Sequence, residues 1–297
     1  VRTMIPSVAC ALCGSRAYRQ VVDMGWRRIL RCADCGLVRA DPLPNPEEKL
    51  RSETYDYESD VACPEVQELF KNYHRDYVED PIIRRMRDHL VDLEAAVGGS
   101  GTLLDVGAAT GIFMHLARER SWQPTGVELC AERAAEASKE FDLSILTGSF
   151  TELSFDGRSF DAISMLDVLE HTTDPLAMAR RAHALLRPGG ALFISVPNQQ
   201  CLLTVLVNAY ARLGGPAAAT KLLPRLYVPI HLHYFTPHTL TRLATTAGFR
   251  LARLRHAPVY LGRYQMPLWM KLPLKTILGV GAALRMNARI EIVAIKA

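Results

Sequence analysis

Four cysteines near the start of the chain have the residue type and spacing of metal ligands. They form two Cys-x-x-Cys-Gly motifs, Cys10–Gly14 and Cys32–Gly36, with strand-like residues between them. Two such turns bring four thiolates together around a tetrahedral Zn²⁺, which is left with no open coordination position. Two disulfides would be unusual in a cytosolic chain, and a redox pair would not need to be duplicated. The spacing predicts a structural zinc ribbon with the ligands Cys10, Cys13, Cys32 and Cys35.

A turn bounded by two glycines is the second chemical signal. Thr102–Val106 has strand character, Gly107-Ala108-Ala109-Thr110-Gly111 follows, and a helical pattern begins at Ile112. Such a turn places unpaired backbone N–H groups beside a ligand, and its small residues allow close approach. It matches neither the dinucleotide fingerprint nor the P-loop. Taken alone, it predicts either a ligand site or an ordinary strand–helix connection.

The strand predicted next, Gln123–Glu128, ends on an acidic residue about twenty positions beyond the turn. An acid in that position can accept hydrogen bonds from both ribose hydroxyls of a nucleoside. Together with the turn, Glu128 therefore predicts a nucleoside-bearing ligand. Ser149 and Phe150 follow the third predicted strand, where an adenine ring could contact them.

Alternating strand and helix patterns from Gly101 onward must position these residues. The alternation predicts an α/β fold with a doubly wound, seven-stranded, Rossmann-like sheet and ligands at the carboxyl ends of its strands. Asp174 and Thr236, each followed by proline, are predicted N-caps. The last strand is expected to return as an antiparallel edge. The predicted strands are Thr102–Val106, Gln123–Glu128, Ser144–Thr147, Phe160–Met165, Ala191–Val196, Phe249–Leu254 and Arg289–Ala294; helices are expected near Ile112–Arg120, Cys130–Glu140, Pro175–Leu186 and Pro237–Ala247.

The length of 297 residues allows one large domain and a small appendage. We predict a zinc ribbon at 1–42, a helical linker at 43–100 and the main domain at 101–297, with substrate-side insertions at 199–235 and 259–287. The linker contains a Tyr55-bearing loop and a helical pattern over Pro64–Val97.

Composition narrows the class of protein further. Hydrophobic residues make up 49% and charged residues 22%, which is typical of a globular chain. A net charge of +4 without a concentrated basic stripe gives no reason to expect a nucleic-acid partner. Neither a signal peptide nor an uninterrupted transmembrane segment is recognisable, so a cytoplasmic protein is expected.

Four segments in this order resemble the successive motifs of class I S-adenosylmethionine-dependent methyltransferases: Leu104–Gly111, Gly126–Glu128, Phe160–Ile163 and Leu186–Gly190. Ala109 stands where the family more often has a glycine. The resemblance implies that Asp105 and Gly107 approach the methionine amino group of S-adenosylmethionine, Glu128 holds its ribose, and Asp167 or Met165 lies near the substrate. The expected cofactor-binding residues are Asp105, Gly107, Ala108, Gly111, Glu128, Leu129, Ser149, Phe150, Met165, Asp167 and Tyr55.

The order of segments along the whole chain resembles that of a bacterial subgroup of these enzymes, whose members modify sugars, polysaccharides and secondary metabolites. Its shared features are the ribbon, the tyrosine-bearing linker and His231–Thr236 before the last helix. Nucleotide-sugar C-methyltransferases are similar in their ribbon and tyrosine-bearing segment. Our leading prediction is O-methylation of a sugar, glycan or natural-product hydroxyl.

A further block, Asp167-Val168-Leu169-Glu170-His171, resembles the Glu-x-x-Glu-His motif with which ubiquinone-pathway O-methyltransferases bind a divalent metal. Asp167 replaces the first glutamate. The resemblance implies a metal site at Asp167, Glu170 and His171, and a general-base role for the same groups is the alternative.

Transfer of a methyl group from a sulfonium requires aligned reactants and removal of a proton from the acceptor. Histidine is the usual base near neutral pH. His231 is our first candidate and His171 the second. His233 is a third, although if one of His231 and His233 acts, the other is expected to pack.

The insertion after the fifth strand contains an apolar helical pattern over Leu202–Leu213, and Met266–Met286 has a similar character. We interpret them as walls for an acceptor, including an apolar, lipid-linked or polyketide-linked one. Three other functions stay open: C-methylation of a nucleotide-linked keto-sugar, RNA methylation, and a non-catalytic scaffold. Val196-Pro197-Asn198 lacks the Asn/Asp-Pro-Pro-Tyr pattern of base amino-group methylation, which disfavours RNA.

Overall fold

The computed structural model describes residues 3–4, 8–25, 27–44, 81–213, 223, 226–227, 230–259 and 268–297. Its strands form two sheets, a seven-stranded sheet in the order β11-β12-β9-β8-β5-β6-β7 and a five-stranded sheet in the order β1-β2-β3-β4-β10. Tyr55 and the part of the Pro64–Val97 pattern before Pro81 lie outside the described residues. The division at 42 and 100 therefore stays a prediction.

The larger sheet has a parallel centre and an antiparallel flank. Strands β5 to β9 pair in parallel, whereas β12 pairs antiparallel with both β9 and β11. The strands are β5 (Thr102–Val106), β6 (Gln123–Glu128), β7 (Ile145–Thr147), β8 (Phe160–Leu166), β9 (Leu186–Pro197), β11 (Phe249–Ala257) and β12 (Arg289–Lys296). The predicted α/β class and seven-stranded sheet are confirmed.

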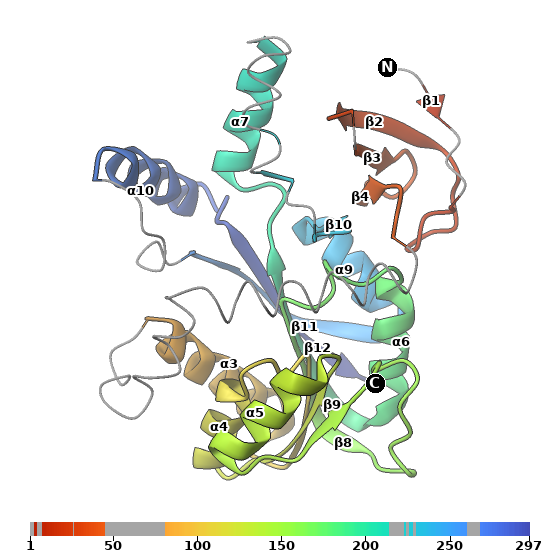
Figure 1. Ribbon diagram of the computed structural model, residues 1–297, viewed down its shortest axis with the longest axis vertical. Helices are drawn as coiled ribbons and strands as arrows, with labels where there is room; N and C mark the ends of the chain where they lie inside the picture. The colour runs from red at the N-terminus through yellow and green to blue at the C-terminus, as the bar shows by residue number, and fades with distance from the viewer. Residues whose placement is uncertain are drawn as a thin grey trace.

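Helices cover both faces of this sheet (Figure 1). On one face lie α3 (Pro81–Val97), α4 (Ile112–Glu119) and α5 (Ala131–Phe141), and on the other α6 (Pro175–Leu185) and α9 (Pro237–Thr246). Successive residues of a strand pack into the cores on opposite faces of the sheet, because side chains alternate along a strand. Leu103 packs in the core on the α3 and α4 side, and Leu104 packs in the core on the α6 and α9 side.

The two predicted helix caps are present. The Asp174 carboxylate accepts a hydrogen bond from the Ala177 backbone N–H at 2.9 Å, and Thr236 forms a reciprocal capping box with Thr239. These caps satisfy N–H groups that have no partner inside the helix. They fix the starts of α6 and α9.

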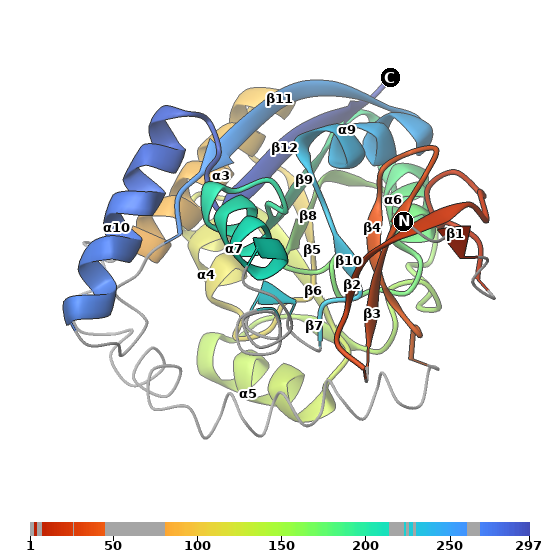
Figure 2. The same ribbon diagram turned by 90° about the horizontal axis from the view of Figure 1, so that it is seen from above.

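The smaller sheet contains the predicted ribbon strands and one strand from far along the chain. Its members are β1 (Thr3–Met4), β2 (Tyr18–Asp23), β3 (Arg28–Cys32), β4 (Val38–Asp41) and β10 (His233–Tyr234). Seen from above, β10 lies beside β4 (Figure 2). Sequence patterns did not predict that the ribbon sheet would include the histidine-bearing segment.

One strand position differs from the expectation. Arg289–Ala294 was expected at an edge, but β12 lies between β9 and β11, and β11 forms the edge. The charged residue Glu291 of β12 is buried and paired with Arg85, His89 and Arg255. These ion pairs allow a carboxylate inside the sheet layer because they offset its desolvation.

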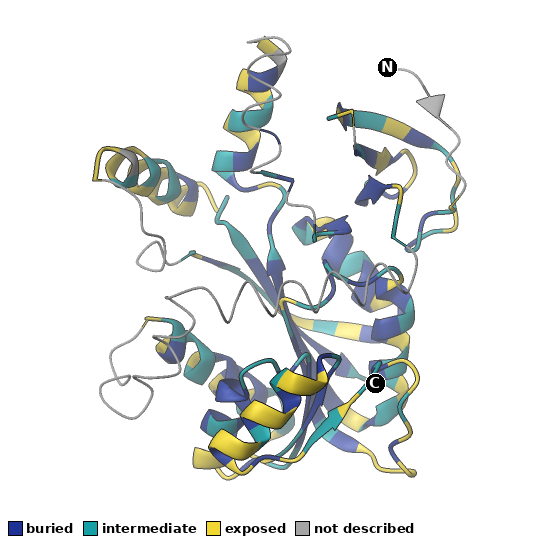
Figure 3. Cartoon of the chain, in the orientation of Figure 1, coloured by how far each residue is buried: buried dark blue, intermediate teal, exposed yellow. Residues whose placement is uncertain are grey.

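Two further helices, α7 (Leu202–Leu213) and α10 (Leu268–Ala283), contact each other beyond the carboxyl ends of the sheet (Figure 1). Much of their surface is exposed (Figure 3). None of the helices in the described part of the chain combines the length and apolar character needed to span a bilayer.

Candidate active site

The glycine turn forms at the carboxyl end of β5, where α/β folds bind ligands. Gly107 and Gly111 have φ angles of 76° and 74°, in the left-handed region that favours glycine. A Cβ on Gly107 would lie 2.7 Å from Val168 Cγ2, and one on Gly111 would lie 2.9 Å from Leu143 Cδ1. Both backbone angles and close packing therefore require glycine at the two ends of the turn.

Glu128 is fixed directly against this turn. Its Oε2 accepts a hydrogen bond from the Ala109 N–H at 2.8 Å, and its Oε1 accepts one from the Cys130 N–H at 3.0 Å. The carboxylate is buried at the end of β6. The structure thus brings together the two sequence features from which a nucleoside ligand was predicted.

Asp105 lies inside the sheet layer, one position before the end of β5. Its Oδ1 accepts a hydrogen bond from Ser164 Oγ at 2.7 Å. Burial raises the pKa of Asp105 to about 7, against the effect of the Ser164 hydrogen bond, and the charge of Glu128 raises it further. A carboxyl group that titrates near neutrality at this position is available to a cationic ligand group.

Other predicted cofactor residues occupy more varied surroundings. Phe150 and Met165 are buried, and the Phe150 ring packs near Phe155 and under the Arg181 guanidinium. That packing differs from the open aromatic surface expected for adenine. Ser149 Oγ lies 2.8 Å from Thr151 Oγ1. The remaining members are Ala108, which is buried, Leu129, which is half-buried, and Tyr55, which lies outside the described residues.

Asp167 is held by an arginine that sequence patterns did not single out. Arg289 Nη2 donates to Asp167 Oδ1 and also to Ser195 Oγ, the latter at 3.0 Å. Arg85 from α3 reaches the same serine oxygen at 3.3 Å. Although burial opposes it, the charge of Arg289 lowers the pKa of Asp167. Asp167 is therefore an ionised partner of Arg289.

The metal-ligating groups that converge are Glu170, His171 and His231. One donor atom from each lies within 4.8 Å of the others. Asp167 pairs with Arg289, and His231 takes its place in this group of donor atoms. The ligand set of Asp167, Glu170 and His171 stays a prediction. His231 comes from the segment just before β10, and its ring meets the His171 ring edge to face at 4.9 Å between centroids.

The electrostatics of this cluster are unusual. Glu170 is 2% exposed, and neither carboxylate oxygen has a hydrogen-bond partner among the described residues. Burial, followed by the charge of Asp167, raises the pKa of Glu170. Burial, followed by the charge of His171, lowers the pKa of His231 to about 3. A buried carboxyl that lies close to the charge of Asp167 and to a neutral imidazole fits a proton-transfer site or a cation site.

His233 lies apart from this cluster. It is 1% exposed, and its Nδ1 lies 3.0 Å from the Thr172 carbonyl oxygen. Burial lowers the pKa of His233 to about 4, and the Thr172 hydrogen bond partly opposes the shift. Of the two histidines in His231–His233, the geometry favours a packing role for His233.

The four ribbon cysteines converge as predicted. Cys10 Sγ lies 3.5 Å from Cys35 Sγ, Cys13 Sγ lies 3.5 Å from Cys32 Sγ, and all four sulfurs fall within 4.8 Å of one another. Four thiols in such a group fit a tetrahedral Zn²⁺ closed to further ligands. A structural zinc ion would stabilise the ribbon and take no part in the chemistry.

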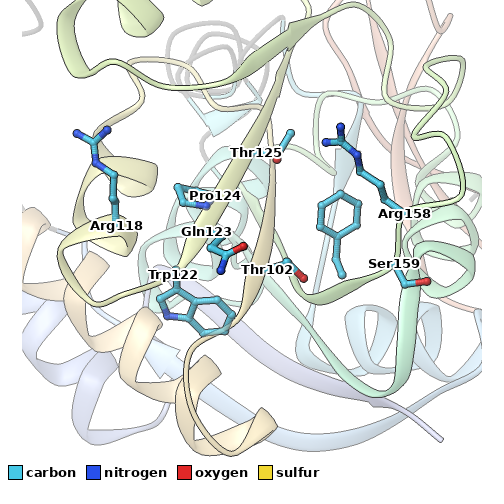
Figure 4. Close-up of a pocket in the computed structure, with 9 residues that line it drawn as sticks. Thr102, Arg118, Trp122, Gln123, Pro124, Thr125, Arg158 and Ser159 are labelled. Atoms are coloured by element: carbon cyan, nitrogen blue, oxygen red, sulfur yellow. The ribbon is translucent and has the colours of Figure 1, made fainter.

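A separate cavity of about 540 Å³ lies at the opposite ends of the strands (Figure 4). Thr102, Gln123 and Phe160, which begin β5, β6 and β8, line it together with Arg118 and Arg158. Ligands of this fold class bind at the carboxyl ends of the strands. We therefore place the active site at the Gly107 turn and not in this cavity.

A family model described as a methyltransferase domain matches residues 73–254, which is more than half of the chain. The chain therefore belongs to this family and is a class I S-adenosylmethionine-dependent methyltransferase. The non-catalytic scaffold is no longer an alternative.

Curated relatives include ubiquinone biosynthesis O-methyltransferases from several bacteria. The Chromobacterium violaceum enzyme is 28% identical over 181 residues, which cover 58% of this chain and 74% of the relative. The Xanthomonas campestris pv. campestris enzyme is 32% identical over 130 residues, covering 41% of this chain and 52% of the relative. The chain thus spans only about half the length of some of these relatives.

Solved structures show the same fold. A methyltransferase from Archaeoglobus fulgidus has a TM-score of 0.52 at 17% identity and covers 77% of this chain and 98% of its own. Magnesium protoporphyrin IX methyltransferase from Synechocystis PCC 6803 has a TM-score of 0.53 at 13% identity, covering 84% and 100%. At these identities the likeness concerns the fold alone.

Proposed function

We propose that this enzyme transfers the methyl group of S-adenosylmethionine to a hydroxyl oxygen of a small molecule, namely a sugar, glycan or natural product. The observation that carries the proposal is the convergence of Glu170, His171 and His231 beyond the end of β8. The naming of several relatives as O-methyltransferases supports transfer to oxygen.

For the donor, we propose a site around the Gly107 turn. The Glu128 carboxylate beside the turn would accept the ribose hydroxyls, and Asp105, with its raised pKa, would face the methionine ammonium. In the first role a carboxylate accepts hydrogen bonds from hydroxyl groups, and in the second a carboxylate faces a cation; both interactions are strengthened by the negative charge.

In the reaction, the acceptor oxygen bonds to the methyl carbon while the carbon–sulfur bond breaks, and its electron pair stays on sulfur. The hydroxyl proton must leave in the same process. At pH 7 the His231 imidazole is neutral because burial lowers its pKa to about 3, and one of its ring nitrogens would take up the hydroxyl proton. Glu170 lies beside it and can share the released proton.

The same cluster fits a divalent cation. Glu170 has two buried carboxylate oxygens without hydrogen-bond partners among the described residues, and neutral imidazoles are the form that binds metals. We propose that Glu170, His171 and His231 would hold such an ion. When bound, it would supply Lewis-acid activation of the acceptor hydroxyl.

The helices α7 and α10 support an apolar acceptor. Leu213 is 89% exposed and Trp269 is 73% exposed. Other exposed apolar side chains on the two helices are Val205, Leu206, Tyr210, Leu268, Leu272 and Val280. The sequence also has no Asp or Glu between Asp174 and Glu291. These features would accommodate a lipid-linked or polyketide-linked acceptor that carries negative charge.

Methyl-labelled S-adenosylmethionine tests the proposal when it is incubated with catechol, a hexose, a nucleotide-linked keto-sugar and a prenylated phenol. The expected result is label on an oxygen of one acceptor, lost in Glu170→Gln. Deuterium exchange from solvent into the keto-sugar without donor, followed by label on carbon, would contradict O-transfer and favour the C-methyltransferase. Label appearing only in added RNA would contradict both.

A further inference from the structure

The ribbon sheet and the acceptor side of the site share a strand. In β10, His233 pairs with Arg39 and Tyr234 pairs with Val38 of β4, and the Ala40 N–H donates to the Leu232 carbonyl oxygen at 2.9 Å. The two views agree that β10 lies along β4 (Figures 1 and 2). The segment that follows His231 is thus the fifth strand of the ribbon.

Only two residues separate Cys35, one of the four ribbon cysteines, from the start of β4, the strand that pairs with β10. β4 begins at Val38, and the Cys32 N–H donates to the Leu37 carbonyl oxygen at 2.9 Å between the second pair of cysteines and β4. The guanidinium of Arg39 stacks over the Tyr18 ring at 4.9 Å, and Tyr18 pairs with Cys32. The thiol cluster is therefore linked to β4 through the Tyr18 ring and through the two residues that join Cys35 to β4.

A second contact reaches His231 from the ribbon hairpin between β2 and β3. Arg27 is 5% exposed, and its Nη2 donates to the His231 carbonyl oxygen. Tyr234 Oη donates to the same oxygen at 3.1 Å. On the other side, the N–H groups of Leu232 and His233 donate to the Glu170 carbonyl oxygen at 2.6 and 3.1 Å. The backbone next to His231 is held between the ribbon and Glu170.

We infer that the ribbon is a positioning module for the acceptor half of the active site, in which Arg27 and β4, the strand that follows the metal cluster, hold His231 against Glu170 and His171. The inference rests on the proposed function in that it takes His231 as a working group of the acceptor half. A metal that closes the four-thiol cluster fixes β4, β4 fixes β10, and β10 fixes His231. The donor half, at the Gly107 turn, makes none of these contacts among the described residues.

Hydrogen exchange followed by mass spectrometry tests the coupling in the full chain, before and after Zn²⁺ is removed by a strong chelator. We expect at least about tenfold faster exchange in 38–41 and 230–236, no change in 102–106 and 123–128, and reversal on adding Zn²⁺. Cys13→Ser should behave like the stripped protein and Cys201→Ser like the wild type. Unchanged exchange in 230–236 after zinc loss would overturn the inference.

Arg27→Gln tests the second contact, with Arg31→Gln on the exposed side of β3 as the matched control. Modification of His231 by diethyl pyrocarbonate should become about tenfold faster in Arg27→Gln, remain unchanged in Arg31→Gln and be largely restored in Arg27→Lys. S-Adenosylmethionine affinity should stay within about twofold in all three. Equal His231 modification in Arg27→Gln and wild type would contradict the positioning role.

Methyl transfer to the acceptor panel separates this inference from the proposed function. Displacement of His231 by an ångström would lower kcat by about 10²-fold with little change in donor KM. Faster exchange in 230–236 with undiminished methyl transfer would support the coupling between the ribbon and the His231 segment but refute the role of His231 in transfer. Unchanged exchange in 230–236 with lost methyl transfer would refute the coupling and leave the role of His231 in place.

Discussion

The imidazole rings of His171 and His231 meet edge to face at 4.9 Å between their centroids, although they come from opposite sides of the site. His171 follows β8 of the large sheet, and His231 precedes β10 of the ribbon sheet. With Glu170 they form a cluster that neither sheet could make alone. The proposed acceptor half of the active site is therefore assembled from segments of both the large sheet and the ribbon sheet.

His231→Gln should lower kcat/KM by about 10²-fold to 10⁴-fold, the usual contribution of a positioned proton acceptor. Its affinity for S-adenosylmethionine should stay close to that of the wild type. Labelled-methyl transfer measures the first quantity and calorimetry the second. His238→Gln, at an exposed histidine of α9, is the matched control and should retain full activity.

Mn²⁺ should bind at the cluster and report its ligands by electron paramagnetic resonance. Glu170→Gln should weaken this binding by at least about tenfold, because it removes the charged ligand. Asp167→Asn should leave it within a few-fold, since Asp167 pairs with Arg289. The opposite order of effects would restore the ligand set first expected from the sequence.

His233 should make the free energy of unfolding depend on pH. Its pKa falls from 6.5 to about 4 on folding, so the unfolded chain takes up a proton at a pH where the folded chain does not. The stabilisation is complete above pH 6.5 and is lost as the pH falls toward 4, by about 3 kcal/mol. Urea unfolding measures this effect: between pH 6.5 and pH 4 the free energy of unfolding of His233→Gln should fall by about 3 kcal/mol less than that of His238→Gln.

Gly107→Ala should destabilise the protein more than Gly157→Ala. Both glycines have positive φ, but a Cβ at 107 would meet Val168 Cγ2 at 2.7 Å, whereas one at 157 has nothing within 4 Å. The backbone cost is about 1–2 kcal/mol in both, and crowding adds about 1–3 kcal/mol at 107. Equal urea midpoints for the two variants would contradict this prediction, because they would show that the turn accommodates a Cβ at position 107 without loss of stability.

The parts of this molecule that sequence patterns predicted are governed by local chemistry. The glycine turn, the caps at Asp174 and Thr236, and the paired cysteine motifs each depend on a few neighbouring residues. The predicted strands of the parallel centre also formed, and the largely apolar run Ala191–Val196 is typical of such a buried strand.

The features that were missed depend on contacts between distant segments. β10 has only two residues, too few for a strand period, and it forms because β4 offers it an edge. The strand Arg289–Ala294 was expected at an edge, yet Glu291 is buried in the sheet, where Arg85, His89 and Arg255 from α3 and β11 contact its carboxylate. Likewise, the position of β12 beside β9 brings Arg289 to Asp167, a pairing between residues 122 positions apart in the sequence.

Calorimetric titration of S-adenosylmethionine into three proteins tests most directly whether donor and acceptor halves are distinct. The wild type should bind, Glu128→Ala should bind about 10-fold to 100-fold more weakly through loss of charge-assisted hydrogen bonds, and Glu170→Gln should bind like the wild type. Glu136→Ala, at an exposed acid on α5, controls for loss of charge. Normal binding by Glu128→Ala, or equal weakening in Glu170→Gln, would contradict this division of the site.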